Sequence, residues 1–304
     1  MIRPPGRPGR LALVLAALLL WPTGALRAQQ GPAWLPADVY FRVPLAAPRE
    51  PSFHAILLSS DVLSPSESGA RAEASALPGA EGREIHGSVA MGGSFRLWRL
   101  AGSSRGGVVV GLQTGVFARF RMESSANELV ATDWLVAFPL EARRGRMSGR
   151  VRLIHWSAHL GDELIEATGA QREDFTFEAL DAIAGYDLGA FRVYGGGALV
   201  LRSQLEDAEG VLPGFSDDGT LQLGADWRWH PWREARLGVV AGADLQWADR
   251  AEWRRQLAAT LGFEARGEKG AATLGLSYFD GPSAMGQFYL TEESWWGVEF
   301  RIEL

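Results

Sequence analysis

Cysteine is absent from the chain, and positive charge is in short supply. Without cysteine, neither a disulfide framework nor a lipid anchor on an N-terminal cysteine can form. The chain carries 30 Lys and Arg residues against 36 Asp and Glu residues, which gives a formal net charge of -6. Because proteins that bind nucleic acid carry clustered surplus basic charge, we expect no nucleic-acid partner.

Long apolar runs are also missing, apart from one near the start of the chain. Residues 11–21 read LALVLAALLLW and follow the basic stretch MIRPPGRPGR. This run is too short for a membrane-spanning helix, which needs about 20 apolar residues. A basic start, a short apolar centre and small residues before a break are typical of a secretory signal peptide, so we predict one over residues 1–28, cleaved after Ala28. Loss of its four arginines would change the formal net charge from -6 to -10 (-6 minus 4).

The rest of the chain is rich in alternating polar and apolar residues. The clearest example is GVVVGLQTGVFARFRM, residues 107–122. Side chains two apart project from the same face of a strand, so one face here is large and apolar while the other carries glycine and arginine. A water-soluble sandwich would bury its apolar faces in a thin core. Large apolar residues over a whole bilayer thickness, opposite a face of glycine and mixed charges, indicate a transmembrane β-barrel.

The number of alternating segments defines the barrel. Bacterial single-chain barrels have an even number of antiparallel strands and place both termini in the periplasm. We therefore predict an all-β, up-and-down transmembrane barrel over residues 52–304, located in the outer membrane. Residues 29–51 are proline-rich and lack alternation, so we predict a periplasmic lead-in that packs on the barrel mouth. The twelve predicted strands lie near residues 52–60, 84–98, 107–122, 129–140, 146–157, 174–188, 190–202, 220–230, 234–247, 253–265, 270–279 and 294–304.

Charged residues of both signs have the inward parity of these strands. A twelve-stranded barrel lies between the eight-stranded barrels that side chains fill and the sixteen-stranded porins that stay open. We therefore predict a filled or narrow lumen with function in the outer loops, and keep a narrow channel for small solutes as an alternative. The predicted inward charges are Arg119, Arg121, Asp133, Glu141, Arg150, Arg152, Asp226, Arg228, Asp244, Glu299 and Arg301.

The strand ends carry further membrane signals. The last strand, WWGVEFRIEL, keeps large apolar residues on one face up to the final residue and resembles the insertion signal of outer-membrane proteins. We expect outer-membrane lipids as partners, the barrel-insertion machinery during biogenesis, and a homodimer as a further option. The tryptophans predicted to form the aromatic girdles of such a barrel are Trp134, Trp156, Trp229, Trp247, Trp253 and Trp296.

Several stretches, in order, resemble one family of outer-membrane proteins, domain-of-unknown-function family 1207. They include FRVPLAAPREPSF, MGGSFRLWRL, IHWSAHLGDE, FEALDAIAGYDLG and YFDGPSAMGQFY, and the likeness covers roughly residues 35 to 304. The resemblance implies an outer-membrane barrel of Gram-negative type. It implies no reaction, because no function is settled for the family.

The stretch LIHWSAHLGDE, residues 153–163, concentrates chemically active side chains. His155 and Ser157 are two apart on a predicted strand and project side by side, which is the minimum for a base and an activated nucleophile. The pattern His-any-Ser on a lipid-facing wall is similar to outer-membrane phospholipase A and lipid A deacylase, which attack acyl esters of membrane lipids. The resemblance implies Ser157 as nucleophile and His155 as general base. Both families have Asn after the Ser, where this chain has Ala158.

A catalytic histidine also needs a group that orients its ring. If Ser157 pairs with Thr176 on the next strand, His155 lies opposite Glu178, with Cβ atoms about 5 Å apart. A carboxylate on the lipid face is costly at mid-depth but nearly free at the interface, so its presence beside His155 is informative.

Two other interpretations of this stretch stay open. His155 and Ser157 can simply mark the point where the strand leaves the hydrocarbon, with a structured loop after it. Alternatively, His159, Asp162 and Glu163 can bind a metal ion, although their spacing is not diagnostic of a metal site. We predict no cofactor.

Overall fold

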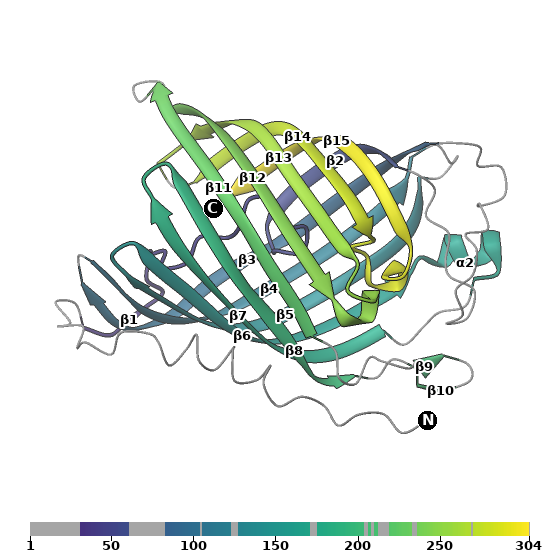
Figure 1. Ribbon diagram of the computed structural model, residues 1–304, viewed down its shortest axis with the longest axis horizontal. Coiled ribbons are helices and arrows are strands. Elements are labelled where there is room, and N and C mark those ends of the chain that lie inside the picture. Colours follow the sequence, from purple (N-terminus) through teal and green to yellow (C-terminus); the bar gives the residue numbers. More distant parts are fainter. Residues whose placement is uncertain are drawn as a thin grey trace.

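The computed structural model describes residues 31–60, 83–103, 105–122, 127–170, 175–203, 206–207, 210–211, 219–232, 236–268 and 270–303. These residues form a closed antiparallel β-barrel (Figure 1). The strands of its wall are β2 (Phe53–Ser60), β3 (Glu84–Ser103), β4 (Gly106–Arg121), β5 (Glu128–Arg144), β6 (Met147–Leu160), β7 (Phe175–Leu188), β8 (Phe191–Ser203), β11 (Gly219–Trp232), β12 (Leu237–Ala248), β13 (Arg255–Arg266), β14 (Ala271–Pro282) and β15 (Glu292–Glu303).

Each wall strand pairs with the next along the chain, and β15 pairs with β2 to close the cylinder. The predicted barrel of twelve strands is confirmed. Three further strands have two residues each. β1 (Ala33–Trp34) pairs with β3, and β9 (Glu206–Asp207) pairs with β10 (Gly210–Val211) in a separate hairpin.

Some strands run further than predicted because bulges interrupt their alternation. β3 continues to Ser103, beyond the predicted end at residue 98. Its pairing with β4 shifts register between Arg96 and Trp98 and again between Arg99 and Ala101. A bulge inserts an extra residue and so breaks the period of two from which a strand is recognised in sequence.

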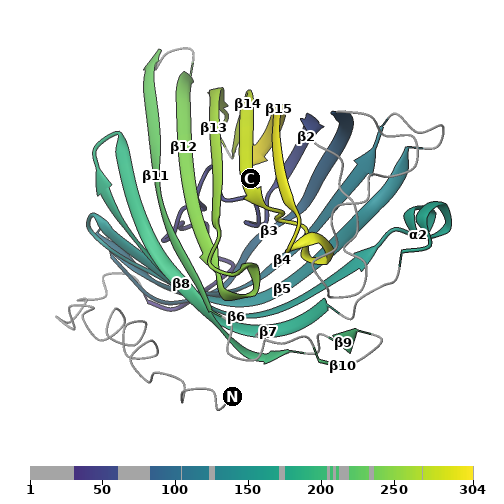
Figure 2. The same ribbon diagram turned by 45° about the vertical axis from the view of Figure 1, so that its right-hand side comes forward.

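The two ends of the barrel differ in their connections. At one end, which we call the turn end, tight turns use Gly145 and Gly189 in the left-handed region, with φ of 60° and 72°. Strand β2 begins at the turn end, and strand β15 finishes there. The opposite loop end carries the short helix α2 (Asp162–Thr168) and the 3-10 helices η1 (Asp249–Ala251) and η2 (Gly286–Phe288) (Figure 2). None of the described helices is both long and apolar enough to span a bilayer.

Strand β5 shows how the wall divides the side chains. Trp134 and Phe138 point outward and are 50% and 61% exposed. Asp133 and Glu141, which have the opposite parity, are buried inside the barrel. The same division holds around the cylinder, where large apolar side chains remain exposed on the outside. This is the surface that a barrel presents to hydrocarbon.

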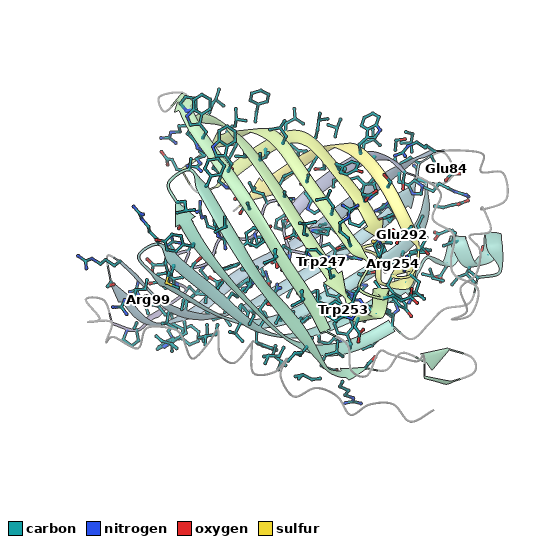
Figure 3. The ribbon with its side chains drawn as sticks, in the orientation of Figure 1. Glu84, Arg99, Trp247, Trp253, Arg254 and Glu292 are labelled. Atoms are coloured by element: carbon teal, nitrogen blue, oxygen red, sulfur yellow. The ribbon has the colours of Figure 1, made fainter. Side chains whose placement is uncertain are left out.

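The prediction that Trp156 belongs to an aromatic girdle is wrong. Trp156 has the parity of the inward arginines of β6, and its side chain is buried inside the barrel. Its ring stacks between Phe117 and Phe177, with centroid distances of 5.7 and 6.2 Å. Its indole N–H donates to Asp133 Oδ2 (3.3 Å). Other predicted girdle residues do lie near the loop end, as Figure 3 shows for Trp247 and Trp253.

The proline-rich lead-in extends beyond the mouth into the lumen. Phe41 and Leu45 are each only 1% exposed. The guanidinium carbons of Arg150 and Arg192 lie 4.7 and 4.5 Å from the centroid of the Phe41 ring. We call residues 40–51 the luminal segment.

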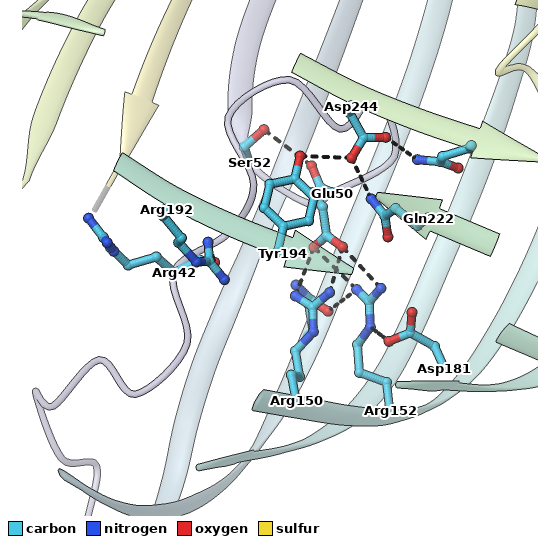
Figure 4. Close-up of polar contacts among 12 residues, drawn as sticks. Arg42, Glu50, Ser52, Arg150, Arg152, Asp181, Arg192, Tyr194, Gln222 and Asp244 are labelled. Atoms are coloured by element: carbon cyan, nitrogen blue, oxygen red, sulfur yellow. Dashed lines mark hydrogen bonds and ion pairs between the residues drawn. The ribbon is translucent and has the colours of Figure 1, made fainter. Parts of the chain in front are cut away.

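Glu50 is the main polar anchor of the luminal segment (Figure 4). Its carboxylate accepts hydrogen bonds of 2.9 and 2.6 Å from Arg150 and of 3.0 and 3.3 Å from Arg152. Arg152 also donates to Asp181 (2.8 Å). Burial by itself would raise the pKa of Glu50, but Arg150 and Arg152 lower it to about 2.

The inward charges predicted from sequence all have buried or half-buried positions inside the barrel. Together with the luminal segment they pack inside the barrel. A cavity of about 140 Å³ remains toward the loop end, with Arg49, Trp156, Phe177 and Gln222 among its lining residues. The packing of the described residues inside the barrel adds no support to the alternative of a narrow solute channel.

Candidate active site on the outward barrel wall

The outward face of β6 changes character near the loop end. Met147 and Leu153 are 39% and 48% exposed and continue the apolar wall. Beyond them His155, Ser157 and His159 occupy the same face, with both histidines exposed and Ser157 half-buried. Polar residues thus replace apolar ones over the last outward positions of the strand.

The predicted register between β6 and β7 is the one found. Ser157 pairs with Thr176, and His155 pairs with Glu178. His155 Nδ1 and Glu178 Oε1 are 3.1 Å apart and are joined by a hydrogen bond. Because a carboxylate only accepts, Nδ1 carries the proton in this bond and Nε2 is left as the basic nitrogen.

The exposure of His155 and Glu178 limits how much their hydrogen bond can stabilise the fold. The side chains of His155 and Glu178 are 52% and 34% exposed. A hydrogen bond between two such exposed side chains contributes little to stability, so it chiefly orients the imidazole. Ser157 Oγ makes no hydrogen bond with the residues that the structure describes. The wall thus holds an imidazole, the carboxylate bonded to it and a neighbouring hydroxyl on one face. Catalytic hydrogen bonds are often loose before substrate binds.

The loop between β14 and β15 braces this wall from the luminal side. The Gly286 N–H donates to Asp133 Oδ2 (2.8 Å), and Gln287 Nε2 donates to the carbonyl oxygen of Ala158 (2.8 Å). Phe288 is 1% exposed. Ala158 is the residue after Ser157, so the loop fixes the backbone directly behind the candidate nucleophile.

The three candidate metal ligands do not converge. His159 lies exposed on the outward face of β6, while Asp162 and Glu163 are exposed in the first turn of α2. Within the described ranges, no group of three or more His, Cys, Asp or Glu side chains could hold a metal ion.

Sequence reasoning missed two features of this region. No sequence pattern indicated that Arg49 and Glu50 anchor the luminal segment, because the position of a segment without alternation cannot be inferred from its sequence. The outward position of Arg202 was also missed, because a bulge in β8 breaks the alternation of that strand. Arg202 pairs with Glu178 across β7 and β8.

Comparison with known proteins places the chain in a family without an assigned role. The profile of the family described as "protein of unknown function (DUF1207)" matches residues 73–303. No curated protein is significantly similar to the sequence.

Solved structures of similar fold are outer-membrane barrels. The outer membrane phospholipase A from Escherichia coli superposes with a TM-score of 0.54 at 14% identity, covering 88% of this chain and 95% of that one. The outer membrane phospholipase dimer from Salmonella typhi, solved with bound calcium, has a TM-score of 0.53 at 14% identity, covering 86% and 94%. At such identity the likeness shows a shared fold and nothing more.

Proposed function

The chain belongs to the DUF1207 family, and from the geometry of its wall we propose that it is an outer-membrane hydrolase of lipid acyl esters. The observation that carries the proposal is the hydrogen bond between His155 and Glu178 beside Ser157 on the outward wall. A Ser, a His and a carboxylate on one face are the parts of a serine hydrolase triad, recognised by geometry and not by order in sequence.

The location of these residues matches a substrate that is itself part of the membrane. The apolar wall below Ser157 contacts acyl chains, and the polar rim above it lies where lipid esters sit. The exposed apolar exterior and the fold shared with outer-membrane barrels support placement in the outer membrane. With the turn end in the periplasm, Ser157 is near the outer surface.

The reaction would proceed in two steps. Ser157 Oγ attacks the carbonyl carbon of the ester while His155 Nε2 takes the hydroxyl proton, and Glu178 stabilises the imidazolium. The alcohol leaves with that proton, and an acyl-serine remains. Water, deprotonated by His155, then attacks the acyl-serine, releases the fatty acid and returns the proton to Ser157. Water is the only co-reactant.

Purified protein in detergent, with a chromogenic fatty-acid ester, tests this proposal. We expect Ser157→Ala to abolish turnover and Glu178→Gln to reduce it strongly, because the neutral amide no longer stabilises the imidazolium. Thr132→Ala is the matched control, since Thr132 is opposite His159 on the same rim and has no role in the reaction. Equal turnover by wild type and Ser157→Ala removes the proposal.

Two partner predictions accompany the proposal. The Salmonella typhi structure, which is described as a dimer, supports the prediction of a homodimer. Chemical cross-linking in detergent tests it, and a single monomer band over a range of protein concentrations would contradict it. Interaction with the barrel-insertion machinery stays a prediction.

A further inference from the structure

A break in strand alternation turns Arg202 onto the outward wall. On β8, Val200 pairs with Ala179 and lines the lumen, so regular alternation would send Arg202 inward as well. The register shifts between Glu178 and Ala179, however, and places Arg202 directly opposite Glu178. Residues paired in this way share a face of the sheet, and Arg202 is accordingly exposed on the outside.

The Arg202 side chain has no partner among the residues that the structure describes. It makes no hydrogen bond or ion pair with the described part of the chain. Other arginines on the loop end are paired, as Arg254 is with Glu292, which Figure 3 shows together. Arg255, at the start of β13, is paired with Asp280. Bulges beside active sites commonly redirect a side chain. This one directs toward the lipid–water boundary a guanidinium that is unpaired among the described residues.

The register sets the distance between this guanidinium and the candidate nucleophile. His155, Glu178 and Arg202 lie at the same level on β6, β7 and β8, so two strand spacings separate His155 from Arg202. Ser157 is two residues beyond His155 on β6. With strands about 4.8 Å apart and a rise of about 3.4 Å per residue, the two backbones are about 12 Å apart. An extended arginine side chain covers a large part of that distance, and a lipid headgroup spans the rest.

We infer that Arg202 binds the phosphate of the lipid whose ester Ser157 attacks, so that phosphate-bearing lipids are the preferred substrates. This inference rests on the proposed function. Guanidinium pairs with phosphate through two parallel N–H donors, and a headgroup phosphate lies only a few bonds from an acyl ester in such lipids. The phosphate can belong to a glycerophospholipid or to a phosphorylated, acylated glucosamine.

The test compares hydrolysis of matched lipids in mixed detergent micelles. The substrates are a phosphatidylglycerol, a diacylglycerol with the same acyl chains, and an acylated glucosamine disaccharide with its phosphates present or removed. The proteins are full-length wild type, Arg202→Gln, Arg202→Lys, and Arg255→Gln as an outward rim arginine on a distant strand. Heat-modifiable electrophoretic mobility verifies that each variant is folded.

We expect wild type to prefer the phosphorylated member of one pair, which identifies the source of the phosphate. Arg202→Gln should lower kcat/KM for that lipid by about tenfold to a hundredfold, the effect of a lost charge-assisted hydrogen bond, and leave the unphosphorylated lipid unchanged. Arg202→Lys should restore part of the preference, and Arg255→Gln should keep all of it.

The failures of the two proposals are distinguishable. If Ser157→Ala abolishes turnover but Arg202→Gln keeps the preference for phosphate, the inference is overturned and the hydrolase proposal stands. If Arg202→Gln lowers kcat/KM equally for the phosphorylated and the unphosphorylated lipid of a pair, Arg202 acts through Glu178 and not on the phosphate. That result would also overturn the inference. If wild type hydrolyses none of the lipids, both proposals fail together.

Discussion

Replacing Glu50 by glutamine removes the charge that anchors the luminal segment. The side chains of Glu50 and Arg150 are 5% and 1% exposed, so solvent does not screen the pair. Four charge-assisted hydrogen bonds at about 1.5 to 3 kcal/mol each would sum to roughly 6 to 12 kcal/mol, which overstates the loss. Arg152 keeps Asp181 and Gln113 as acceptors, both at 2.8 Å.

The loss therefore falls mainly on Arg150, whose buried charge is left without its carboxylate. Breaking one such pair lowers the free energy of unfolding by about 3 to 5 kcal/mol, and we expect Glu50→Gln to fall in this range. The assay is denaturant unfolding of the barrel in lipid vesicles, followed by tryptophan fluorescence. A double-mutant cycle with Arg150→Met isolates the coupling between the two side chains.

Glu292→Gln is the matched control in the same barrel. Glu292 is paired with Arg254, but their side chains are 55% and 31% exposed. An exposed ion pair contributes at most about 1 kcal/mol, so this variant should be nearly neutral. If Glu50→Gln and Glu292→Gln lower the free energy of unfolding equally, the luminal segment is not held by the buried charge of Glu50.

Three further predictions follow from the structure. Because the folded-state pKa of Glu50, about 2, is below its ordinary value, its contribution to stability should be present above about pH 4.5 and lost as the pH falls toward 2; unfolding measured between pH 7 and pH 3 should show a smaller loss in Glu50→Gln than in wild type, and equal losses would contradict this. Leu153→Arg places a charge in the middle of the lipid-facing wall and should lower the free energy of unfolding by about 2 to 4 kcal/mol, whereas Thr132→Arg near the rim should lower it by no more than about 1 kcal/mol; equal effects would mean that the wall does not face hydrocarbon. Phe288→Ala empties a buried site behind Ala158 and should lower the free energy of unfolding by about 3 to 5 kcal/mol and also reduce esterase turnover, and an unchanged denaturation midpoint would show that the loop does not brace the wall.

Much of the candidate site could be predicted because strand pairing is local. Once His155 and Ser157 were assigned the outward parity of β6, only the register to the next strand was undetermined. The pairing of His155 with Glu178 is the one that keeps a charged residue beside a polar partner near the interface. Arg202 could not be predicted in the same way, since a single extra residue in β8 reverses the face of everything after it.

Trp156 illustrates a conflict between composition and parity. Tryptophan near a strand end suggests an aromatic girdle, but its even position on β6 places it among the inward arginines. The structure follows parity, because reversing one side chain would require a bulge, and the β6 pairings are continuous. The stacking of Trp156 with Phe117 and Phe177 shows that the lumen also has an aromatic region.

The sequence by itself determined the barrel: its strand number, the antiparallel order, and which face of each strand is apolar, because these follow from a period of two that can be counted residue by residue. Tertiary structure alone decided that the luminal segment enters the lumen and that Arg202 stands on the outward rim. The path of the luminal segment depends on Glu50 meeting Arg150 and Arg152, which are about 100 residues away in the chain. No local pattern encodes an ion pair between such distant positions, since its partners become neighbours only when the cylinder closes.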